Sequence, residues 1–218
     1  MTRAIYAIYG ASGCGRSLMP VAREQLQQQS IDANIYFIDD SLKQPKEINA
    51  HMALNYAAFK ALEAKDKFVL IAIANSKIRQ KLAQQLAQDG IQLWQVRANN
   101  VVVMDQVEIG AGAALSPFVT ITSNIKIGEC FHANLYSYVE HDCIIGDFVT
   151  FAPGVKCNGN IIIEDHAYIG TGAIIQQGTP DQPIVIGKGA VVGMGAVVTK
   201  SVPAGITVVG NPAKPLIR

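Results

Sequence analysis

Hydrophobic and polar positions follow two different patterns along the chain. Up to about residue 97, short runs of consecutive apolar residues alternate with segments whose apolar residues recur at helical spacing. After that point the helical spacing is absent, and one apolar position returns every six residues. Because hydrophobic periodicity follows local secondary structure, we expect two domains, residues 1–97 and residues 98–218.

The first region predicts a small α/β domain. Apolar runs indicate strands at residues 4–9, 34–38 and 68–74. Helical spacing indicates helices at residues 21–29, 51–64 and 77–90. Pro20 would delay or kink the first helix, whereas Asn75 opens the last one and Gly90 closes it. Apolar strands that alternate with helices predict a parallel sheet covered by helices, a Rossmann-like arrangement.

The second region is a six-residue repeat. Counted in sixes from Ile109 it reads IGAGAA, LSPFVT, ITSNIK and onward, and the first position of each frame is apolar, with Ala133 and Cys157 as small members. The frame slips by five residues near 179–185 and then resumes. One short strand and a turn make one side, and three sides close a coil of about 18 residues whose strands stack ~4.8 Å apart. The pattern therefore predicts a parallel β-helix of about five to six coils.

Composition narrows the classes of function. Half of the residues are hydrophobic, 16% are charged and the net charge is +1, which argues against nucleic acid as a partner. No apolar stretch reaches the ~18 residues of a membrane span, and we read no signal peptide at the N-terminus. The four cysteines form no CxxC pair, so we expect no zinc site and a cytoplasmic protein with free thiols.

Several motifs resemble one family. They are YGASGCG at residues 9–15, the acidic strand end at 38–40, AIANSKIR at 72–79, VEHDCIIG at 139–146 and VGNPAK at 209–214. Together they resemble the bacterial sugar acetyltransferases of the PglD/NeuD type, which serve surface-glycan synthesis. The resemblance implies that the β-helix is left-handed, and that the enzyme is a homotrimer whose active sites lie between subunits.

The resemblance also implies a reaction. Acetyl-CoA would donate its acetyl group to the C4 amine of a UDP-4-amino-4,6-dideoxy sugar, as in bacillosamine-type glycan synthesis. Two alternatives stay open. One is a sugar O-acetyltransferase of the sialic-acid type, whose motifs overlap heavily with these. The other is a β-helix scaffold without catalytic activity.

His141 is the candidate general base. An amine or hydroxyl acceptor must lose a proton as it attacks a thioester, and an imidazole, with an ordinary pKa of ~6.5, accepts protons at neutral pH. By resemblance, Asp142 orients the imidazole. Because successive strand residues face opposite sides, the two can cooperate only at a corner of the coil or across a subunit boundary. The plainer alternative is an exposed turn histidine.

The other three histidines suggest no metal centre. We expect His51 on a helix, His132 at a coil corner and His166 exposed in a turn. None is paired with Cys, Asp or Glu at metal-ligand spacing, so we expect chemistry without a metal.

The resemblance implies an acyl site on the β-helix. Thr150 stands where a relative carries a histidine, and a hydroxyl can donate a hydrogen bond but cannot carry positive charge. Glycine at position 159 would let the pantetheine arm approach the backbone. The implied set is Asn134 beside the acyl and acceptor groups, with Thr150, Gly159, Thr171 and Met194 along acetyl-CoA. Asn and Gly are also routine corner residues in such coils.

The glycine-rich turn at residues 10–15 is the candidate nucleotide site. It follows a strand and opens a helix, which is the context for holding a pyrophosphate on helix N–H groups. The resemblance implies that Ser12, Gly13 and Cys14 contact the diphosphate, that Asp39 and Asp40 contact the ribose or base, and that Ala74 lies beside the base. The family more often has His at position 14. The alternatives are a helix cap for Asp40 and plain packing for Ala74.

Overall fold

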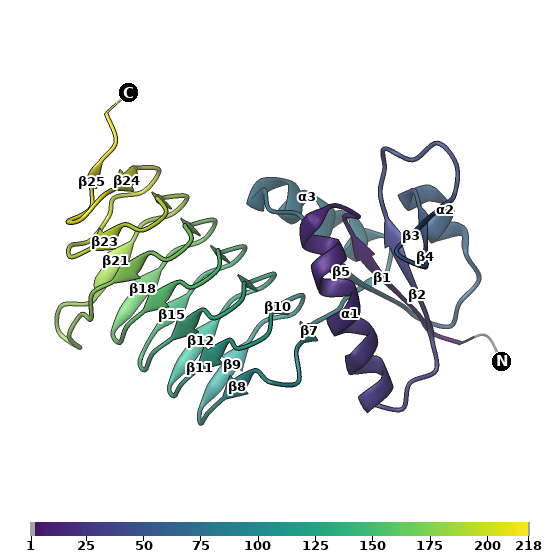
Figure 1. The fold of residues 1–218 in the computed structure, drawn as a ribbon, viewed down its shortest axis with the longest axis horizontal. Coiled ribbons are helices and arrows are strands. Elements are labelled where there is room, and N and C mark those ends of the chain that lie inside the picture. Colours follow the sequence, from purple (N-terminus) through teal and green to yellow (C-terminus); the bar gives the residue numbers. More distant parts are fainter. Residues whose placement is uncertain (1–2, 218) are drawn as a thin grey trace. The chain divides into compact units, whose positions relative to one another are not determined.

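The computed structural model describes residues 3–217. Contacts within the chain divide it into two compact units, one ending at Ala98 and the other beginning at Asn99. The first is an α/β unit and the second is a β-helix (Figure 1). Each unit has its own core.

The α/β unit is built on a twisted, mainly parallel sheet. Its elements are β1 (Ile5–Tyr9), α1 (Gly13–Gln28), β2 (Asn34–Ile38), β3 (Lys46–Ile48), β4 (His51–Leu54), α2 (Tyr56–Ala61), β5 (Lys67–Ile71), α3 (Ser76–Gln88), β6 (Gln92–Leu93) and β7 (Val96–Arg97). The sheet order is β3-β4-β2-β1-β5-β6. Only the β3–β4 pair is antiparallel within it. The predicted strand at 34–38 is confirmed, and the ends of β1, β2 and β5 meet at one edge, as parallel pairing requires.

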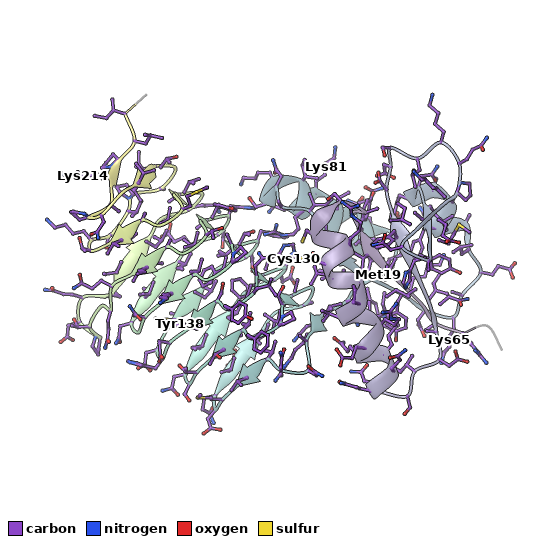
Figure 2. All side chains as sticks on the ribbon, viewed as in Figure 1. Met19, Lys65, Lys81, Cys130, Tyr138 and Lys214 are labelled. Atoms are coloured by element: carbon purple, nitrogen blue, oxygen red, sulfur yellow. The ribbon has the colours of Figure 1, made fainter. Side chains whose placement is uncertain are left out.

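Helix α1 begins earlier than its proline suggests. It starts at Gly13 and continues through Pro20, although proline lacks the N–H that would bond to the preceding turn. Buried side chains on both sides of Pro20 hold the helix against the sheet, among them Leu18, Met19 (Figure 2) and Leu26. Tertiary packing therefore offsets the lost hydrogen bond.

The expected helix at residues 51–64 is wrong over its first half. Asn49 and Ala50 both adopt positive φ angles, +48° and +61°, and form the turn of a β3–β4 hairpin that draws His51–Leu54 into a strand. Asn55 then caps the short helix α2, its side-chain oxygen accepting from Ala58 N at 2.9 Å. The predicted ends of α3 are confirmed, since Asn75 caps it and Gly90 follows it at a φ of +69°.

The second unit consists of three parallel sheets, one for each side of the coil (Figure 1). One side holds β8 (Val102–Val103), β11 (Thr120–Ile121), β14 (Tyr138–Val139), β17 (Lys156–Cys157), β20 (Ile174–Ile175) and β23 (Val197–Val198). The next holds β9 (Val107–Ile109), β12 (Ile125–Ile127), β15 (Ile144–Ile145), β18 (Ile161–Ile163) and β21 (Ile184–Ile186). The third holds β10 (Ala114–Leu115), β13 (His132–Ala133), β16 (Thr150–Phe151), β19 (Tyr168–Ile169), β22 (Val191–Val192), β24 (Thr207–Val209) and the antiparallel β25 (Lys214–Pro215).

The six-residue frame predicts the stacking of these coils. Its first positions are buried, as at Leu115, Phe151 and Ile175, and residues 18 apart pair across coils, as Ala133 does with Phe151. The predicted slip is also confirmed. Ile161 pairs with Ile184, because a short turn closed by hydrogen bonds between Thr179 and Gln182 adds five residues to that coil.

Two expectations about histidines in the β-helix are wrong. His132 lies in strand β13 rather than at a corner and is 3% exposed. His166 does occupy a corner, with a φ of +63°, but it is only 7% exposed. Its ring stacks on that of Phe148, 18 residues earlier, with centroids 5.4 Å apart, and aromatic stacking between coils buries it.

Candidate active site

His141 and Asp142 meet at a corner of the β-helix. Strand β14 ends at Val139, and Asp142 turns the chain with a φ of +58°, a conformation that Asn and Asp tolerate better than most residues. The turn brings the two side chains to the same side, so that His141 Nδ1 lies 2.7 Å from Asp142 Oδ2. The condition set by the sequence, a corner rather than a strand, is met.

The charge of Asp142 fixes the proton on the imidazole. Hydrogen bonds from His141, and next from Asn124, hold the pKa of the Asp142 carboxyl below its ordinary value. Asp142 is therefore ionised at neutral pH and can only accept hydrogen bonds. Nδ1 of His141 must then carry the hydrogen, which leaves the Nε2 lone pair open to receive a proton. The His141 side chain is 43% exposed, so the imidazole is open to solvent.

Two further residues at this corner were not singled out by sequence reasoning as partners of the pair. Asn124, 18 residues before Asp142, donates from Nδ2 to Asp142 Oδ1 at 3.1 Å. Gly159, 18 residues after His141, lies against the imidazole, because a Cβ there would be 2.5 Å from His141 Cε1 and 2.6 Å from Nε2. Adding one coil length to His141 and subtracting one from Asp142 would have found both residues.

The other predicted acyl-site residues are spread over the β-helix. Asn134 follows β13, and its side-chain amide donates to Phe151 O at 2.7 Å. Thr150 is buried in β16, whereas Thr171 is exposed at a corner. Met194 is 81% exposed. Asn134 and His141 have different hydrogen-bond partners, Phe151 and Asp142.

Three of the predicted substrate residues line one pocket in the α/β unit. This pocket has a volume of about 350 Å³ and lies at the ends of β1 and β2. Ser12, Asp39 and Asp40 line it together with apolar side chains of Ile73 and Leu82. Gly13 and Cys14 follow Ser12 in the first turn of α1, and Ala74 follows Ile73 in the sequence.

The glycines of the turn have different roles. Gly10 has a φ of +114°, and a Cβ on Gly15 would lie 1.7 Å from Gly10 O, so the fold itself requires both. A Cβ on Gly13 would meet no atom within 4 Å. The side chain of Ser12 does not cap α1. The start of α1 is therefore open, with backbone N–H groups and the positive end of the helix dipole available to an anion.

The two aspartates at the end of β2 differ in how many of their carboxylate oxygens are already hydrogen-bonded. Asp40 accepts from the Tyr9 hydroxyl and, at 2.9 Å, from Tyr56 N, so that both of its oxygens are engaged. Burial, and next the hydrogen bond to Asp40, raises the pKa of Tyr9, which keeps the phenol a donor. Asp39 accepts from Ser41 N and Ser41 Oγ through Oδ1 alone. Of the two, Asp39 has more capacity to bind a ligand.

Arg79 is a buried residue of this unit that the sequence did not reveal as special. Its guanidinium is 0% exposed and donates from Nη1 to Ile73 O at 2.7 Å and to Ala74 O at 3.3 Å. Burial raises the pKa of the Cys14 thiol, and the charge of Arg79 works in the opposite direction. Arg79 therefore fixes the backbone where Ile73 joins the pocket wall.

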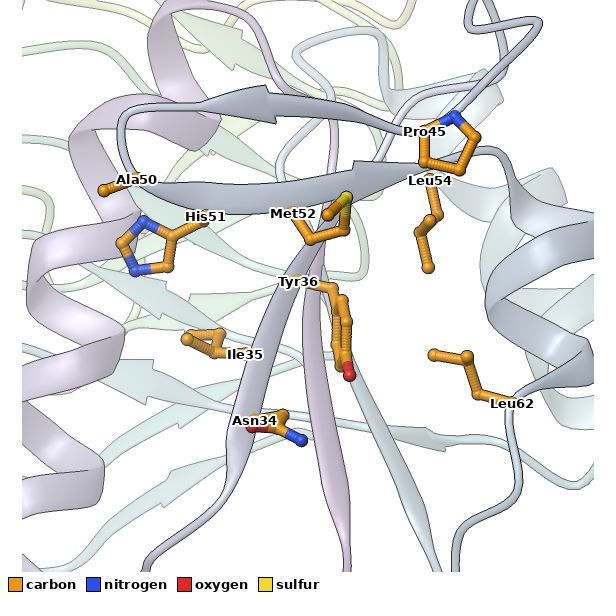
Figure 3. A pocket seen from close by; sticks show the side chains of 9 residues that line it. All are labelled: Asn34, Ile35, Tyr36, Pro45, Ala50, His51, Met52, Leu54 and Leu62. Atoms are coloured by element: carbon orange, nitrogen blue, oxygen red, sulfur yellow. The ribbon is translucent and has the colours of Figure 1, made fainter.

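A larger pocket of the α/β unit lies apart from these residues. It has a volume of about 540 Å³ and is lined by Tyr36, His51, Met52, Leu54 and Leu62 among others (Figure 3). Its lining is largely apolar, and it includes none of the predicted substrate residues. The smaller pocket is the better candidate for the nucleotide site, because its lining includes Ser12, Asp39 and Asp40, although the larger pocket has the greater volume.

Residues 3–217 have neither a metal-binding cluster nor a membrane-spanning helix. No group of three or more His, Cys, Asp or Glu side chains in that range is arranged to hold a metal ion. Within the same range, no helix is both long and apolar enough to cross a membrane.

Comparison with protein families places both units. The model of the PglD N-terminal domain matches residues 6–86. The model of the hexapeptide repeat of succinyl-transferase matches residues 160–200. These matches fall on the two units of the structure and agree with the predicted order of an α/β domain followed by a left-handed parallel β-helix.

Comparison with individual proteins covers the whole chain. GDP-perosamine N-acetyltransferase of Escherichia coli O157:H7 is 51% identical over 215 residues, 98% of this chain and 97% of that protein. WeeI from Acinetobacter baumannii AYE is 59% identical with a TM-score of 0.94, covering 98% of this chain and all of that one. The acetyltransferase domain of PglB from Neisseria gonorrhoeae FA1090, in complex with acetyl coenzyme A, is 27% identical with a TM-score of 0.84, covering 99% and 100%. The chain therefore belongs to the hexapeptide-repeat sugar acetyltransferases with a PglD-type N-terminal domain, which are acetyl-CoA-dependent enzymes.

Proposed function

We propose that the protein transfers the acetyl group of acetyl-CoA to the 4-amino group of a GDP-linked 4-amino-4,6-dideoxy sugar of the perosamine kind. The observation that carries this proposal is the end-to-end similarity, at 51% identity, to a protein named GDP-perosamine N-acetyltransferase. The UDP-linked sugar implied by the sequence motifs is the second candidate, favoured by the family resemblance of the turn YGASGCG. The two candidate substrates share the amine that is acetylated and differ in the nucleobase, guanine or uracil.

In the proposed reaction, His141 acts as the general base. Its Nε2 accepts the proton that the amine loses, while the amine nitrogen forms a bond to the thioester carbonyl carbon. The carbon–sulfur bond then breaks, and the imidazolium returns the proton to the CoA thiolate. The products are an amide and free CoA, and the base is restored. The hydrogen bond of 2.7 Å between Nδ1 and Asp142 supports this role, because it leaves Nε2 without a hydrogen.

The free carboxylate oxygen of Asp39 supports a guanine base. Guanine presents two adjacent donors, N1–H and the 2-amino group, which suit a carboxylate that only accepts hydrogen bonds. Uracil presents one donor between two acceptors and suits it less well. In the same proposal, the diphosphate lies on the open first turn of α1 at Ser12, Gly13 and Cys14. Asp40 then shapes the pocket through Tyr9 and Tyr56, and Ala74 borders the base.

We place acetyl-CoA along the β-helix, beside His141. Gly159 packs under the imidazole and leaves the neighbouring surface open to the pantetheine arm. Thr150 and Asn134 would orient the acyl group, and the exposed Thr171 and Met194 would line the rest of the arm. The side chain of Met194 is flexible and apolar, which suits contact with an unbranched ligand.

A cytoplasmic homotrimer with active sites between adjacent β-helices completes the proposal. An acyl site that takes Asn134 and His141 from different subunits is compatible with the structure, because the two side chains bond to different groups within one chain, Phe151 and Asp142. Exposed apolar side chains on the β-helix, such as Tyr136 and Met194, would then gain cover. None of the four cysteines forms a disulfide, as in proteins of the reducing cytoplasm.

A substrate panel tests the proposal. The full-length protein is incubated with acetyl-CoA and, in separate reactions, GDP-perosamine, a UDP-4-amino-4,6-dideoxy sugar and free sialic acid, and released CoA thiol is measured. We expect the highest kcat/KM with the GDP sugar. Faster turnover of the UDP sugar would assign the second candidate. Turnover of sialic acid alone would replace N-acetylation by O-acetylation, and no turnover of any sugar would leave the scaffold alternative.

A further inference from the structure

The β-helix connects three successive coils at the corner that carries His141. Asn124 and Asp142 occupy the same corner position one coil apart, with φ angles of +61° and +58°. Asn124 Nδ2 donates to Asp142 Oδ1 at 3.1 Å, and the other carboxylate oxygen accepts from His141 Nδ1 at 2.7 Å. One oxygen of Asp142 is therefore bonded to a residue of the preceding coil, and the other to its own chain neighbour His141.

The hydrogen bond from Asn124 restricts the rotation of the Asp142 carboxylate. Nearly half of the Asp142 side chain is exposed, so packing does little to hold it. A carboxylate anchored through one oxygen presents the other in a fixed direction, whereas an unanchored one turns and exchanges partners with water. The ring of His141 is confined on its other side, since Gly159 is buried against it.

We propose that Asn124 is a positioning residue of the acetyl transfer: it fixes the Asp142 carboxylate, and through it the Nδ1–H tautomer of His141. This inference rests on the proposed role of His141 as the base. Asn124 itself touches neither the imidazole nor the reacting atoms. Asn124 therefore affects the rate only by changing the fraction of His141 side chains whose Nε2 carries no hydrogen and points toward the substrate.

The same corner provides a matched control. Gln106 lies one coil before Asn124 with a φ of +56°, and its substitution does not touch Asp142. Gln106→Gly and Asn124→Gly both place glycine where positive φ is already present, so neither introduces backbone strain. Only the second removes the amide that bonds to Asp142.

The kinetic test compares these variants with the GDP-linked amino sugar and acetyl-CoA. We expect Asn124→Gly to lower kcat about tenfold, as loss of a group that orients a catalytic partner does, with both KM values unchanged. Gln106→Gly should keep the wild-type kcat. Equal kcat values for the two glycine variants, or a loss confined to KM, would overturn the inference.

A second variant distinguishes the loss of the hydrogen bond from a folding defect. Asn124→Asp keeps the shape but replaces the donor with a second carboxylate, which raises the pKa of Asp142 by like-charge repulsion. Asp142 then lies between His141 on one side and this new carboxylate on the other. The added negative charge also favours the protonated form of the imidazole, which lacks a bare Nε2. We expect the acid limb of kcat/KM to move to higher pH; a folded Asn124→Asp enzyme with the wild-type profile and kcat would contradict the inference.

The tautomer of His141 can also be observed without substrate. Nitrogen-15 NMR of the imidazoles, with the His141 signals assigned by their loss in His141→Ala, should show Nδ1 protonated in the wild type. In Asn124→Gly the population should move toward the Nε2–H form. An unchanged tautomer in Asn124→Gly would refute the positioning role, even if the wild-type protein acetylated no sugar. If instead the tautomer shifted as expected but the wild-type protein acetylated no sugar, only the proposed function would be refuted.

Discussion

The two units hold their polar side chains in place by different means. In the β-helix, partners lie one coil apart, so that Asn124 bonds to Asp142 and the ring of His141 lies against Gly159. In the α/β unit, Tyr9 bonds to Asp40 across 31 residues and Asp40 to Tyr56 across 16. Tyr56 in turn donates to Asp89 across 33 residues at 2.6 Å. No common spacing relates these contacts.

This difference predicts that substitutions in the two units change different properties of the protein. The corner that carries His141 is held by the coils above and below it, and its side chains are partly exposed, so they can change while the coil stays intact. The polar chain of the α/β unit links β1, the end of β2, α2 and the end of α3. Its residues support the fold and the pocket together. We therefore expect changes in the β-helix corner to lower turnover, and changes in the α/β unit to affect stability and nucleotide binding.

The largest effect is expected for His141→Ala. Loss of a general base costs about 10²–10⁴-fold in rate, and we expect kcat to fall by about 10³-fold. The affinity for GDP, measured by calorimetry, should stay at the wild-type value, because the proposed nucleotide site lies in the α/β unit. His51→Ala, a histidine in strand β4 of that unit, is the matched control and should keep full turnover. Activity of His141→Ala near the wild-type level would remove the proposed mechanism.

The next effect is a loss of stability in the α/β unit. In Gly15→Ala the new Cβ would lie 1.7 Å from Gly10 O, a backbone atom that cannot move aside. We expect a cost of about 3 kcal/mol in the free energy of unfolding, measured by denaturant titration. Gly13→Ala is the control, since its Cβ meets no atom within 4 Å. It should keep or slightly raise stability while weakening GDP binding, because the methyl group would obstruct the open turn of α1.

Equal stabilities of the Gly13→Ala and Gly15→Ala proteins would contradict this division of roles within the turn. Stability lost in Gly13→Ala, with GDP binding intact, would count against the nucleotide site on α1.

A smaller effect separates two glycines within the β-helix. In Gly159→Ala the three atoms nearest to the Cβ all belong to the imidazole of His141, a side chain that can rotate away. In Gly128→Ala it would lie 2.8 Å from Asp147 N and from Gly146 C, which are backbone atoms of the next coil. We expect Gly159→Ala to lose about 30-fold in kcat, because the base is turned away from its substrate, with little change in melting temperature. Gly128→Ala should show the reverse. A melting temperature that falls equally in both variants would contradict the distinction.

How far the sequence predicts this molecule depends on which region is read. The six-residue frame predicts the inward residues, the 18-residue pairing and the slip before Ile184. The frame also relates His141 to Gly159, which lies one coil later. A glycine in the sequence, however, does not show whether a ligand or a neighbouring side chain excludes a Cβ at that position. Reading position 159 only as a cofactor site therefore missed the imidazole that lies there.

The α/β unit resists prediction for a different reason. The hairpin turn at Asn49 and Ala50 places an alanine at a φ of +61°, and alanine gives no sequence signal for such a turn. The strand that follows was therefore expected as a helix. The burial of Arg79 depends on the carbonyl groups of Ile73 and Ala74, which a helical pattern does not show. Contacts of this kind are set by tertiary packing, and no period in the sequence carries them.

The smallest effect tests which base the α/β unit prefers. Asp39→Asn should keep the short turn to Ser41, which uses only Oδ1. It replaces the other oxygen with an amide NH2 group, which donates hydrogen bonds and cannot accept one from guanine. We expect GDP affinity to fall about fivefold, the cost of about one hydrogen bond, while UDP affinity changes less and kcat at saturating sugar is unchanged. Asp32→Asn, an exposed residue of the same unit that pairs with Arg3, controls for the lost charge. If GDP and UDP weaken equally, Asp39 contributes charge but no base selectivity. In that case the preference for guanine would have to come from the apolar wall of the pocket at Ile73 and Leu82.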